Sequence, residues 1–197
     1  MENILRECVR LNDYERLRIE FKPYFSEVVD TKQIAIAVSL YKKIVREFVP
    51  NFDVQKCDDR IRSAISEIKK GVYKFKDSPK ALSELVGVNT VYYWDPYYVV
   101  SIEMTLCCDY KSNRDKGFIE TNFYFTGHLE PVTLEKLSDI GFPKVYESVD
   151  YKICEEYLHL ALFSAQDELL KECGLSSVPF SISTSYGVLN AERQGEN

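Results

Sequence analysis

The sequence lacks the motifs that most directly identify an enzyme. It contains only two histidines, His128 and His159. It has no G-x-x-x-x-G-K-[ST] or G-x-G-x-x-G loop for phosphates, no G-x-S-x-G nucleophile elbow and no H-E-x-x-H zinc motif. An enzyme that relies on histidine bases or ligands therefore has little to work with. The sequence predicts no cofactor.

Long apolar runs are also missing. A membrane-spanning helix needs about 20 consecutive apolar residues, and no run in this chain approaches that length. The first residues, M-E-N-I-L-R-E, lack the basic and apolar regions of a signal peptide. We therefore expect a protein that does not enter a membrane and that stays in the cytoplasm.

Closely spaced cysteine pairs of the C-x-x-C type, which zinc sites favour, are absent as well. A chain of 197 residues with 45% hydrophobic content can fill a core without disulfides. We therefore interpret most of the thiols as buried, because free cysteine behaves as a small hydrophobic residue. The six cysteines are Cys8, Cys57, Cys107, Cys108, Cys154 and Cys173.

The net charge of -6 is unevenly distributed. Residues 1–80 hold 17 basic and 13 acidic residues, a net charge of +4, whereas residues 81–197 hold 8 and 18, a net charge of -10. An acidic carboxyl-terminal half disfavours contact with a phosphate backbone over the whole surface. Nucleic acid binding is therefore not expected outside the amino-terminal part.

Helical periodicity dominates the first half of the chain. Pro50 is the expected end of one helix, and Gly71 the expected end of the next. Residues 15–22 leave helix and strand open, because R-L-R-I-E-F-K also alternates with period two. The expected helices are 2–11, 30–49, 54–70, 78–87, 133–140 and 150–173.

Strand patterns begin after residue 88. Residues 97–110 alternate apolar and polar side chains, as a strand with one wet face does. Residues 118–128 also alternate, and the loop K-S-N-R-D-K-G between the two segments predicts a long hairpin. We place Leu106 opposite Phe123 in that hairpin. A last strand is expected at F-S-I-S-T-S-Y-G-V.

These elements predict an α+β fold. We expect an antiparallel sheet of about four to five strands packed against the long carboxyl-terminal helix, with an amino-terminal helical layer. Residues 1–197 are expected to form a single domain, with a possible helical subdomain at 1–87, a sheet and helix subdomain at 88–190 and a disordered tail at 191–197.

The polar face of the predicted hairpin is the best place to look for chemistry. In the expected register, Glu103 and His128 are diagonal neighbours, and a carboxylate beside an imidazole suits acid-base catalysis. The solvent face of a sheet explains the same positions, and we favour that interpretation over a reaction site. Cys107 and His128 would lie about 20 Å apart in this register, too far for a thiolate and its base. The candidate catalytic or ligand-binding residues are Glu103, Tyr124, Thr126 and His128.

Two other groups of residues suggest weaker sites. Asp109 and Glu120 approach one another at the end of the hairpin and could bind a divalent cation, unless the neighbouring basic residues neutralise them. Glu156 and His159 have the E-x-x-H spacing of di-metal helical bundles, but the chain lacks the second such pair. We therefore expect Glu155 and His159 to be solvated on the outer side of their helix.

A lysine-rich run offers a third candidate site. Residues 69–80 interleave lysines with Tyr73 and Phe75, and single-stranded nucleic acid binding requires cations for phosphates and rings for base stacking. An edge strand whose lysines prevent it from pairing with another strand would show the same sequence pattern. The candidate nucleic-acid-binding residues are Lys70, Lys74 and Lys76.

Three functions follow from these patterns. The first is a non-catalytic binding protein that docks onto or inhibits another macromolecule. It is favoured by the lack of any catalytic motif, by the uneven charge and by 14 tyrosines, since tyrosine is enriched in interfaces. Toxin-immunity proteins and phage counter-defence inhibitors are of this type, an analogy of size and charge only. The second is a small-ligand binder or enzyme that uses the hairpin face, and the third is a nucleic-acid-binding module. Protein is the expected partner, and the oligomeric state is left open.

Overall fold

A computed structural model describes most of the chain. It covers residues 2–21, 31–76, 87–95, 99–107, 111–113, 118–120, 125–128, 132–146, 148–178, 180–184 and 187–191. For the strands, Leu134 excepted, the description is confined to the backbone. The expected helix at 78–87 and the expected tail at 191–197 lie almost entirely outside the described residues.

Among the described residues, five α-helices form the main body of the molecule. These are α1 (Glu2–Leu11), α2 (Tyr14–Phe21), α4 (Thr31–Phe48), α5 (Val54–Lys76) and α6 (Val149–Glu172). The expected helices at 2–11, 30–49 and 150–173 are confirmed, and the open segment is helical as far as Phe21. The expected end of the second helix at Gly71 is wrong, because α5 continues to Lys76.

Short polar side chains fix where several of these helices begin and end. The Asp53 carboxylate accepts from the Lys56 amide at 3.0 Å at the start of α5, and the Ser148 hydroxyl accepts from the Tyr151 amide at 3.1 Å at the start of α6. Each side chain satisfies an amide that has no partner within the first turn of its helix. Helix α6 ends where Gly174 takes a positive φ of 70°.

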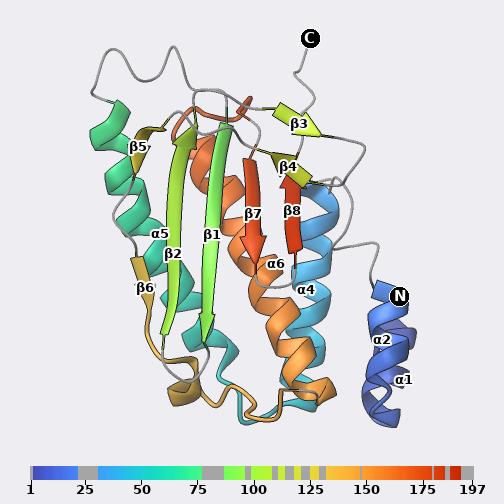
Figure 1. The fold of residues 1–197 in the computed structure, drawn as a ribbon. Helices are drawn as coiled ribbons and strands as arrows, with labels where there is room; N and C mark the ends of the chain where they lie inside the picture. The colour runs from blue at the N-terminus through green and yellow to red at the C-terminus, as the bar shows by residue number, and fades with distance from the viewer. Residues whose placement is uncertain are drawn as a thin grey trace.

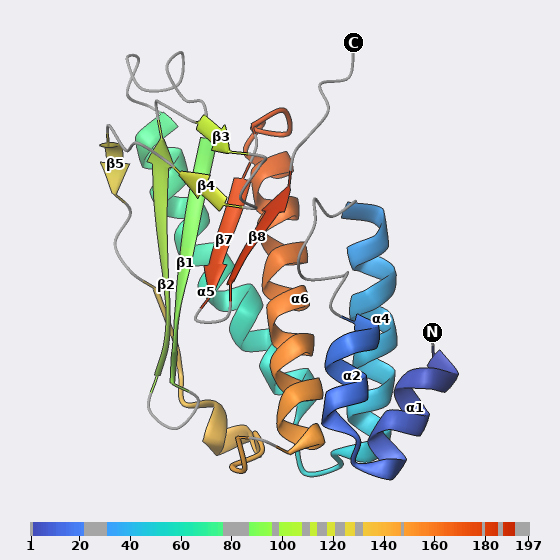
Figure 2. The same cartoon turned by 45° about the vertical axis from the view of Figure 1, so that its right-hand side comes forward.

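Helix α6 is the central element of the molecule. Figures 1 and 2 show α5 and α6 against one face of the sheet, with α4 on the side of α6 remote from the sheet. Helix α6 is therefore covered on more than one side. Its buried residues point in every direction around the helix axis and include three aromatic residues, Tyr151, Tyr157 and Phe163. A helix that is covered on several sides buries residues around its whole circumference, and in α6 these include polar residues as well as apolar ones.

The strands form a mixed sheet. Its order is β5-β2-β1-β7-β8, and β6 also pairs with β2. The pair β1 and β7 is parallel, and the chain passes through α6 between these two strands. The other pairs in this sheet are antiparallel. The bounds are β1 Gly87–Asp95, β2 Val99–Cys107, β5 Phe125–His128, β6 Val132–Leu134, β7 Phe180–Thr184 and β8 Gly187–Ala191.

The predicted pairing of 97–110 with 118–128 is confirmed, but its register is wrong. Strand β3 (Lys111–Asn113) pairs with β4 (Phe118–Glu120) as a separate two-stranded ribbon, and β2 pairs with β5. Thr105 lies opposite His128, where we expected Ser101. A register irregularity between Leu106 and Cys107 separates the two parts of the hairpin, and bulges of this kind cannot be read from alternation alone.

The predicted α+β fold with an antiparallel sheet of four to five strands is therefore wrong. The described side chains build a body of five helices, and the strands form a six-stranded mixed sheet. Other expectations fail in detail: residues 133–140 contain β6 and a short 3-10 helix, η2 (Leu137–Ile140), and the last expected strand divides into β7 and β8. The single-domain assignment stays a prediction.

One end of the helical body is closed by aromatic rings. Phe52, between α4 and α5, packs edge-to-face against Phe142, and Phe142 packs against Tyr151 of α6, with centroid distances of 5.5 and 5.3 Å. The Asp53 amide donates to the Ile140 carbonyl at 2.8 Å. These contacts join the α4–α5 connection to the η2 segment and to α6.

Candidate functional site

The candidate catalytic residues of the hairpin lie on two paired strands. Glu103 is on β2, and Thr126 and His128 are on β5, while Tyr124 lies outside the described residues. The sequence-based register placed His128 opposite Ser101, two residues before Glu103 on β2. In the structure His128 is opposite Thr105, two residues after Glu103, so it is again a diagonal neighbour of Glu103. The same register places Cys107 two residues from Thr105, much closer to His128 than the distance of about 20 Å expected from the sequence.

The other sequence candidates fall on different elements. Glu120 is on β4 opposite Lys111, and Asp109 lies outside the described residues. In the part of the chain that the structure describes, no group of three or more potential metal ligands comes together. The cation site at Asp109 and Glu120 therefore stays a prediction from the sequence.

The lysine run belongs to the last turns of α5, not to an edge strand, as far as Lys76. The Lys70 ammonium pairs with Glu67 at 2.5 Å, and Lys69 pairs with Glu172 of α6. Lys74 and Lys76 are in the last turn of the same helix. Helical geometry spreads these lysines around the axis, so the alternation of rings and charges in the sequence does not form two faces.

Sequence reasoning missed a group of ionisable side chains on α6. Lys152, Glu155 and His159 are each less than a tenth exposed. The prediction that Glu155 and His159 are solvated is wrong, because the outer side of α6 is covered by other helices. The continuous apolar run L-H-L-A-L-F at residues 158–163 was the signal for a helix without a solvent side.

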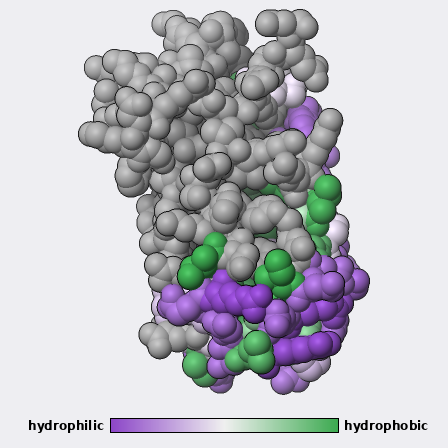
Figure 3. All heavy atoms as spheres, turned by 90° about the vertical axis from the view of Figure 1, so that its right-hand side faces the viewer, coloured by the Kyte–Doolittle hydropathy of each residue, from purple (hydrophilic) through white to green (hydrophobic). Residues whose placement is uncertain are grey.

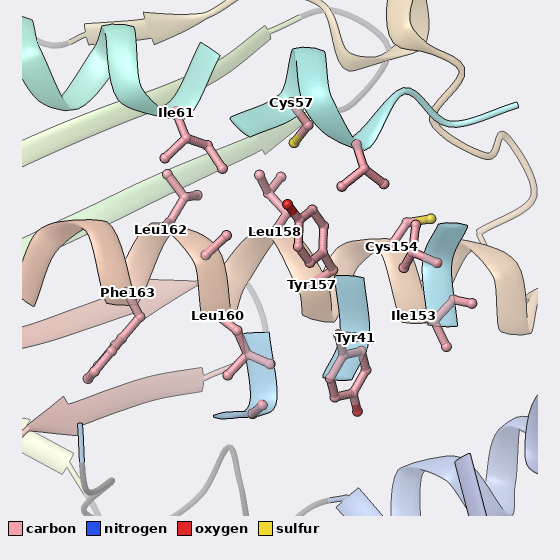
Figure 4. Packing of buried hydrophobic residues seen from close by; sticks show 14 of the residues in the cluster. Tyr41, Cys57, Ile61, Ile153, Cys154, Tyr157, Leu158, Leu160, Leu162 and Phe163 are labelled. Carbon is pink, nitrogen blue, oxygen red and sulfur yellow. The ribbon is translucent and has the colours of Figure 1, made fainter. Parts of the chain in front are cut away.

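Two hydrogen-bonded groups connect α6 to α4 and α5. The Tyr41 hydroxyl of α4 donates to Glu156, and the Tyr157 hydroxyl donates to Asp58 of α5, which also pairs with Lys42 of α4. Figure 4 shows Tyr157 reaching from α6 toward α5 beside Cys57, and Tyr41 on another side of α6. These polar contacts therefore cross the interfaces between the three largest helices.

A third group surrounds the start of α6. The Lys152 ammonium donates to Glu155 at 3.0 Å and lies 4.4 Å from the ring centroid of Tyr146 and 5.5 Å from that of Tyr14. Burial opposes the charge on Lys152, but the hydrogen bond and the attraction of Glu155 outweigh it, so the pKa of Lys152 lies above its ordinary value. Burial raises the pKa of Glu155 despite that same partner. The rings stabilise a buried cation by cation–π attraction.

Burial determines the protonation state of the remaining groups. It raises the pKa of Glu156 to about 8, against a stabilising hydrogen bond from Tyr41, and lowers the pKa of His159 to about 4. It also raises the pKa of Tyr157, as does the hydrogen bond to Asp58. At neutral pH, Glu156 is therefore largely protonated and His159 is neutral.

The described thiols are unsuited to nucleophilic chemistry. Cys8, Cys57, Cys154 and Cys173 are buried and form no disulfide, which confirms the prediction for these four. Burial raises the pKa of Cys57 to about 12 and that of Cys154 well above its ordinary value. Since the thiolate is the nucleophile, these cysteines serve packing.

Comparison with known proteins gives no relative from which a role could be transferred. No family model matches the chain, and no curated protein and no solved structure matches it either. Among the described residues, no helix has both the length and the apolar character that crossing a membrane requires.

Proposed function

We propose that this chain is a non-catalytic binding protein that acts in the cytoplasm by docking onto, or inhibiting, another protein. The observation that carries the proposal is the exposure of large apolar side chains on the first helices. Leu11 of α1, Ile19 of α2 and Ile36 of α4 are 63%, 71% and 68% exposed. Exposed apolar side chains that gather in one patch with a polar rim mark protein interaction sites, and we propose that these three residues form such a patch.

The surroundings of these side chains fit an interface better than a reaction site. Figure 3 views the molecule from the side of α1, α2 and α4, and its lower part shows hydrophobic residues emerging between hydrophilic ones. Ion pairs hold the helices beneath: Arg6 of α1 pairs with Glu47 of α4, and Lys43 of α4 pairs with Glu2 at 2.6 Å. These ion pairs join α1 to α4 beneath the exposed apolar side chains.

The buried ionisable groups of α5 and α6 also favour a binding role over a catalytic one. A general base needs a pKa near the working pH, whereas His159 titrates near 4 and the Cys57 thiol near 12. Glu156 titrates near 8 but is engaged by Tyr41 between two helices. These groups join helices, and a binding role does not require them to react.

The proposal predicts that charge on the exposed apolar positions abolishes partner binding. The wild-type chain is first used to capture a stoichiometric partner from the native host and to identify it. Ile19→Asp and Ile36→Asp should each reduce recovery of that partner by tenfold or more, which corresponds to about 1.4 kcal/mol of binding free energy. Thermal unfolding should stay nearly unchanged, because both side chains are already exposed.

Tyr73→Asp is the matched control. Tyr73 is also apolar in part and exposed, at 41%, but belongs to α5. The Tyr73→Asp variant should therefore leave recovery of the partner unchanged. Wild-type chain that recovers no stoichiometric partner, or three variants that behave alike, would contradict the proposed function.

A further inference from the structure

The strand register assembles a row of polar residues across the main sheet. His128 of β5 is opposite Thr105 of β2, which is opposite Asn89 of β1. Asn89 is in turn the partner of Ser181 in β7, and Ser181 is the partner of Asn190 in β8. With neighbouring strands about 4.8 Å apart, this row extends about 19 Å across five strands. We call it the polar row.

The rows on either side of it along the strands have a different composition. The adjacent row contains Met104, Thr90, Ile182 and Leu189, and the row on the other side contains Leu106, Val88, Phe180 and Ala191. Successive positions of a strand belong to opposite faces of a sheet. The polar row and these two apolar rows therefore belong to opposite faces.

One buried side chain identifies which face meets the helices. Leu134 of β6 is 1% exposed in the helical core, and its register partner in β2 is Val100. Val100 has the same parity as Met104 and Leu106, so the apolar rows belong to the helix-covered face. The polar row belongs to the other face, on which Figures 1 and 2 place no described helix.

The β3–β4 ribbon overhangs this second face. In Figure 1 the ribbon lies over the upper part of the sheet near β8, and in Figure 2 it shifts away from the helices, as an element in front of the sheet does. Strands β4 and β8 are in contact. The polar row crosses the same upper part of the sheet, since Thr105 is two residues before the end of β2 and Asn190 is one residue before the end of β8, and both strands point upward in Figure 1.

Charge restricts what such a row can bind. It contains no lysine or arginine, and residues 81–197 carry a net charge of -10, so phosphates and other anions are disfavoured. It contains no carboxylate either, and the next row on the same face supplies only Glu103, so a divalent cation lacks ligands. An extended peptide would pair with a sheet edge and not with a face.

Residue chemistry points to a neutral ligand. Serine, threonine, asparagine and neutral histidine all combine donor and acceptor capacity. A hydroxyl both donates and accepts, so a ligand with many hydroxyl groups complements a row of this composition. The next row on the same face adds Val91 and Val188, which suit the C–H faces of a sugar ring.

We propose that the polar row, His128–Thr105–Asn89–Ser181–Asn190, is a binding site for a neutral, hydroxyl-rich ligand of the saccharide class. This site is distinct from the docking surface on α1, α2 and α4, and it does not depend on the proposed function. Binding requires no catalysis. The ligand extends along the row, with the β3–β4 ribbon above one end of it.

The test is a titration of the isotopically labelled full chain with maltotriose, cellotriose and chitotriose, followed by backbone amide NMR. At least one trisaccharide should give saturable shifts centred on the amides of Asn89, Thr105 and Ser181. The Asn89→Ala/Ser181→Ala double variant should weaken that binding at least fivefold, while Ser66→Ala on the exposed side of α5 leaves it unchanged.

Several outcomes overturn the proposal. They are no saturable shift at millimolar concentrations of all three sugars, shifts centred on the helices, equal affinity in the double variant, and binding of inorganic phosphate or ADP at the row in place of sugar. Amide shifts also report whether the double variant is folded, and if it is not, the single variant Asn190→Ala replaces it. Ile19→Asp should leave sugar binding intact, so the failure of this site and the failure of the docking surface are distinguishable.

Discussion

Replacing Gly141 with alanine is expected to lower the free energy of unfolding by about 4 kcal/mol or more, enough to prevent folding of a marginally stable domain. Gly141 has a φ of 80° at the end of η2. A Cβ at this position would lie 1.8 Å from the backbone oxygen of Asn51. The atoms nearest to this Cβ belong to the backbone of Asn51 and Phe52, so no side chain can move aside to relieve the clash. The α4–α5 connection must instead separate from η2, and the hydrogen bond from Asp53 to Ile140 holds these two segments together.

Gly174 provides the matched control, because it also has a positive φ, 70°, after the end of α6. Alanine there should cost only the left-handed backbone conformation, about 1 to 2 kcal/mol. Chemical denaturation of both variants with tryptophan or circular dichroism detection measures the difference. Equal losses for the two glycines would show that the Asn51 contact does not restrict position 141.

Glu156→Gln is expected to remove a pH dependence of stability. The pKa of Glu156 is raised from 4.5 to about 8 in the folded chain, chiefly by burial. Between these values the folded state binds the proton and the unfolded state releases it, so stability falls as pH rises from 4.5 to 8. Glutamine keeps a partner for Tyr41 and never ionises. Because Glu156 is half-buried and solvent screens it in part, we expect a gain of about 1 to 3 kcal/mol at pH 8.

The measurement is the free energy of unfolding of both chains at pH 5 and pH 8. Subtracting the wild-type value at each pH removes the contributions of other titrating groups, including His159. That histidine acts in a lower window: its pKa falls from 6.5 to about 4, so its contribution is complete above 6.5 and is lost as pH falls toward 4. A gain for Glu156→Gln that is the same at both pH values would contradict the burial of this carboxyl.

Local signals in the sequence predicted helices well and sheet topology poorly. Asp53, Ser148 and Gly174 act within one turn of their helices, so their effects are visible over a few residues. The β1–β7 pair joins residues about 90 positions apart, and no alternation within either strand indicates which partner it takes. Strand β1 was missed because a central strand of V-N-T-V-Y-Y-W type lacks a clean alternation.

The polar groups of α6 were misread for a related reason. The sequence predicts that only one side of α6, the side that packs against the sheet, is covered, which assigns Glu155 and His159 to solvent. Two further layers, α4 on one side and α2 near Tyr14 on another, cover the remainder of the helix. Amphipathic spacing reports a single interface, whereas a helix between two layers has more than one.

The central claim of this account is that α6 is the enclosed core of the molecule and that its ionisable residues serve helix packing. Native-state hydrogen exchange tests it most directly. The amides of residues 153–163 should exchange only through global unfolding, with the largest protection in the chain. Protection of Glu155, Glu156 and His159 no greater than that of the exposed residues of α5, such as Ser66 and Glu67, would show that this side of α6 opens to solvent and would contradict the account.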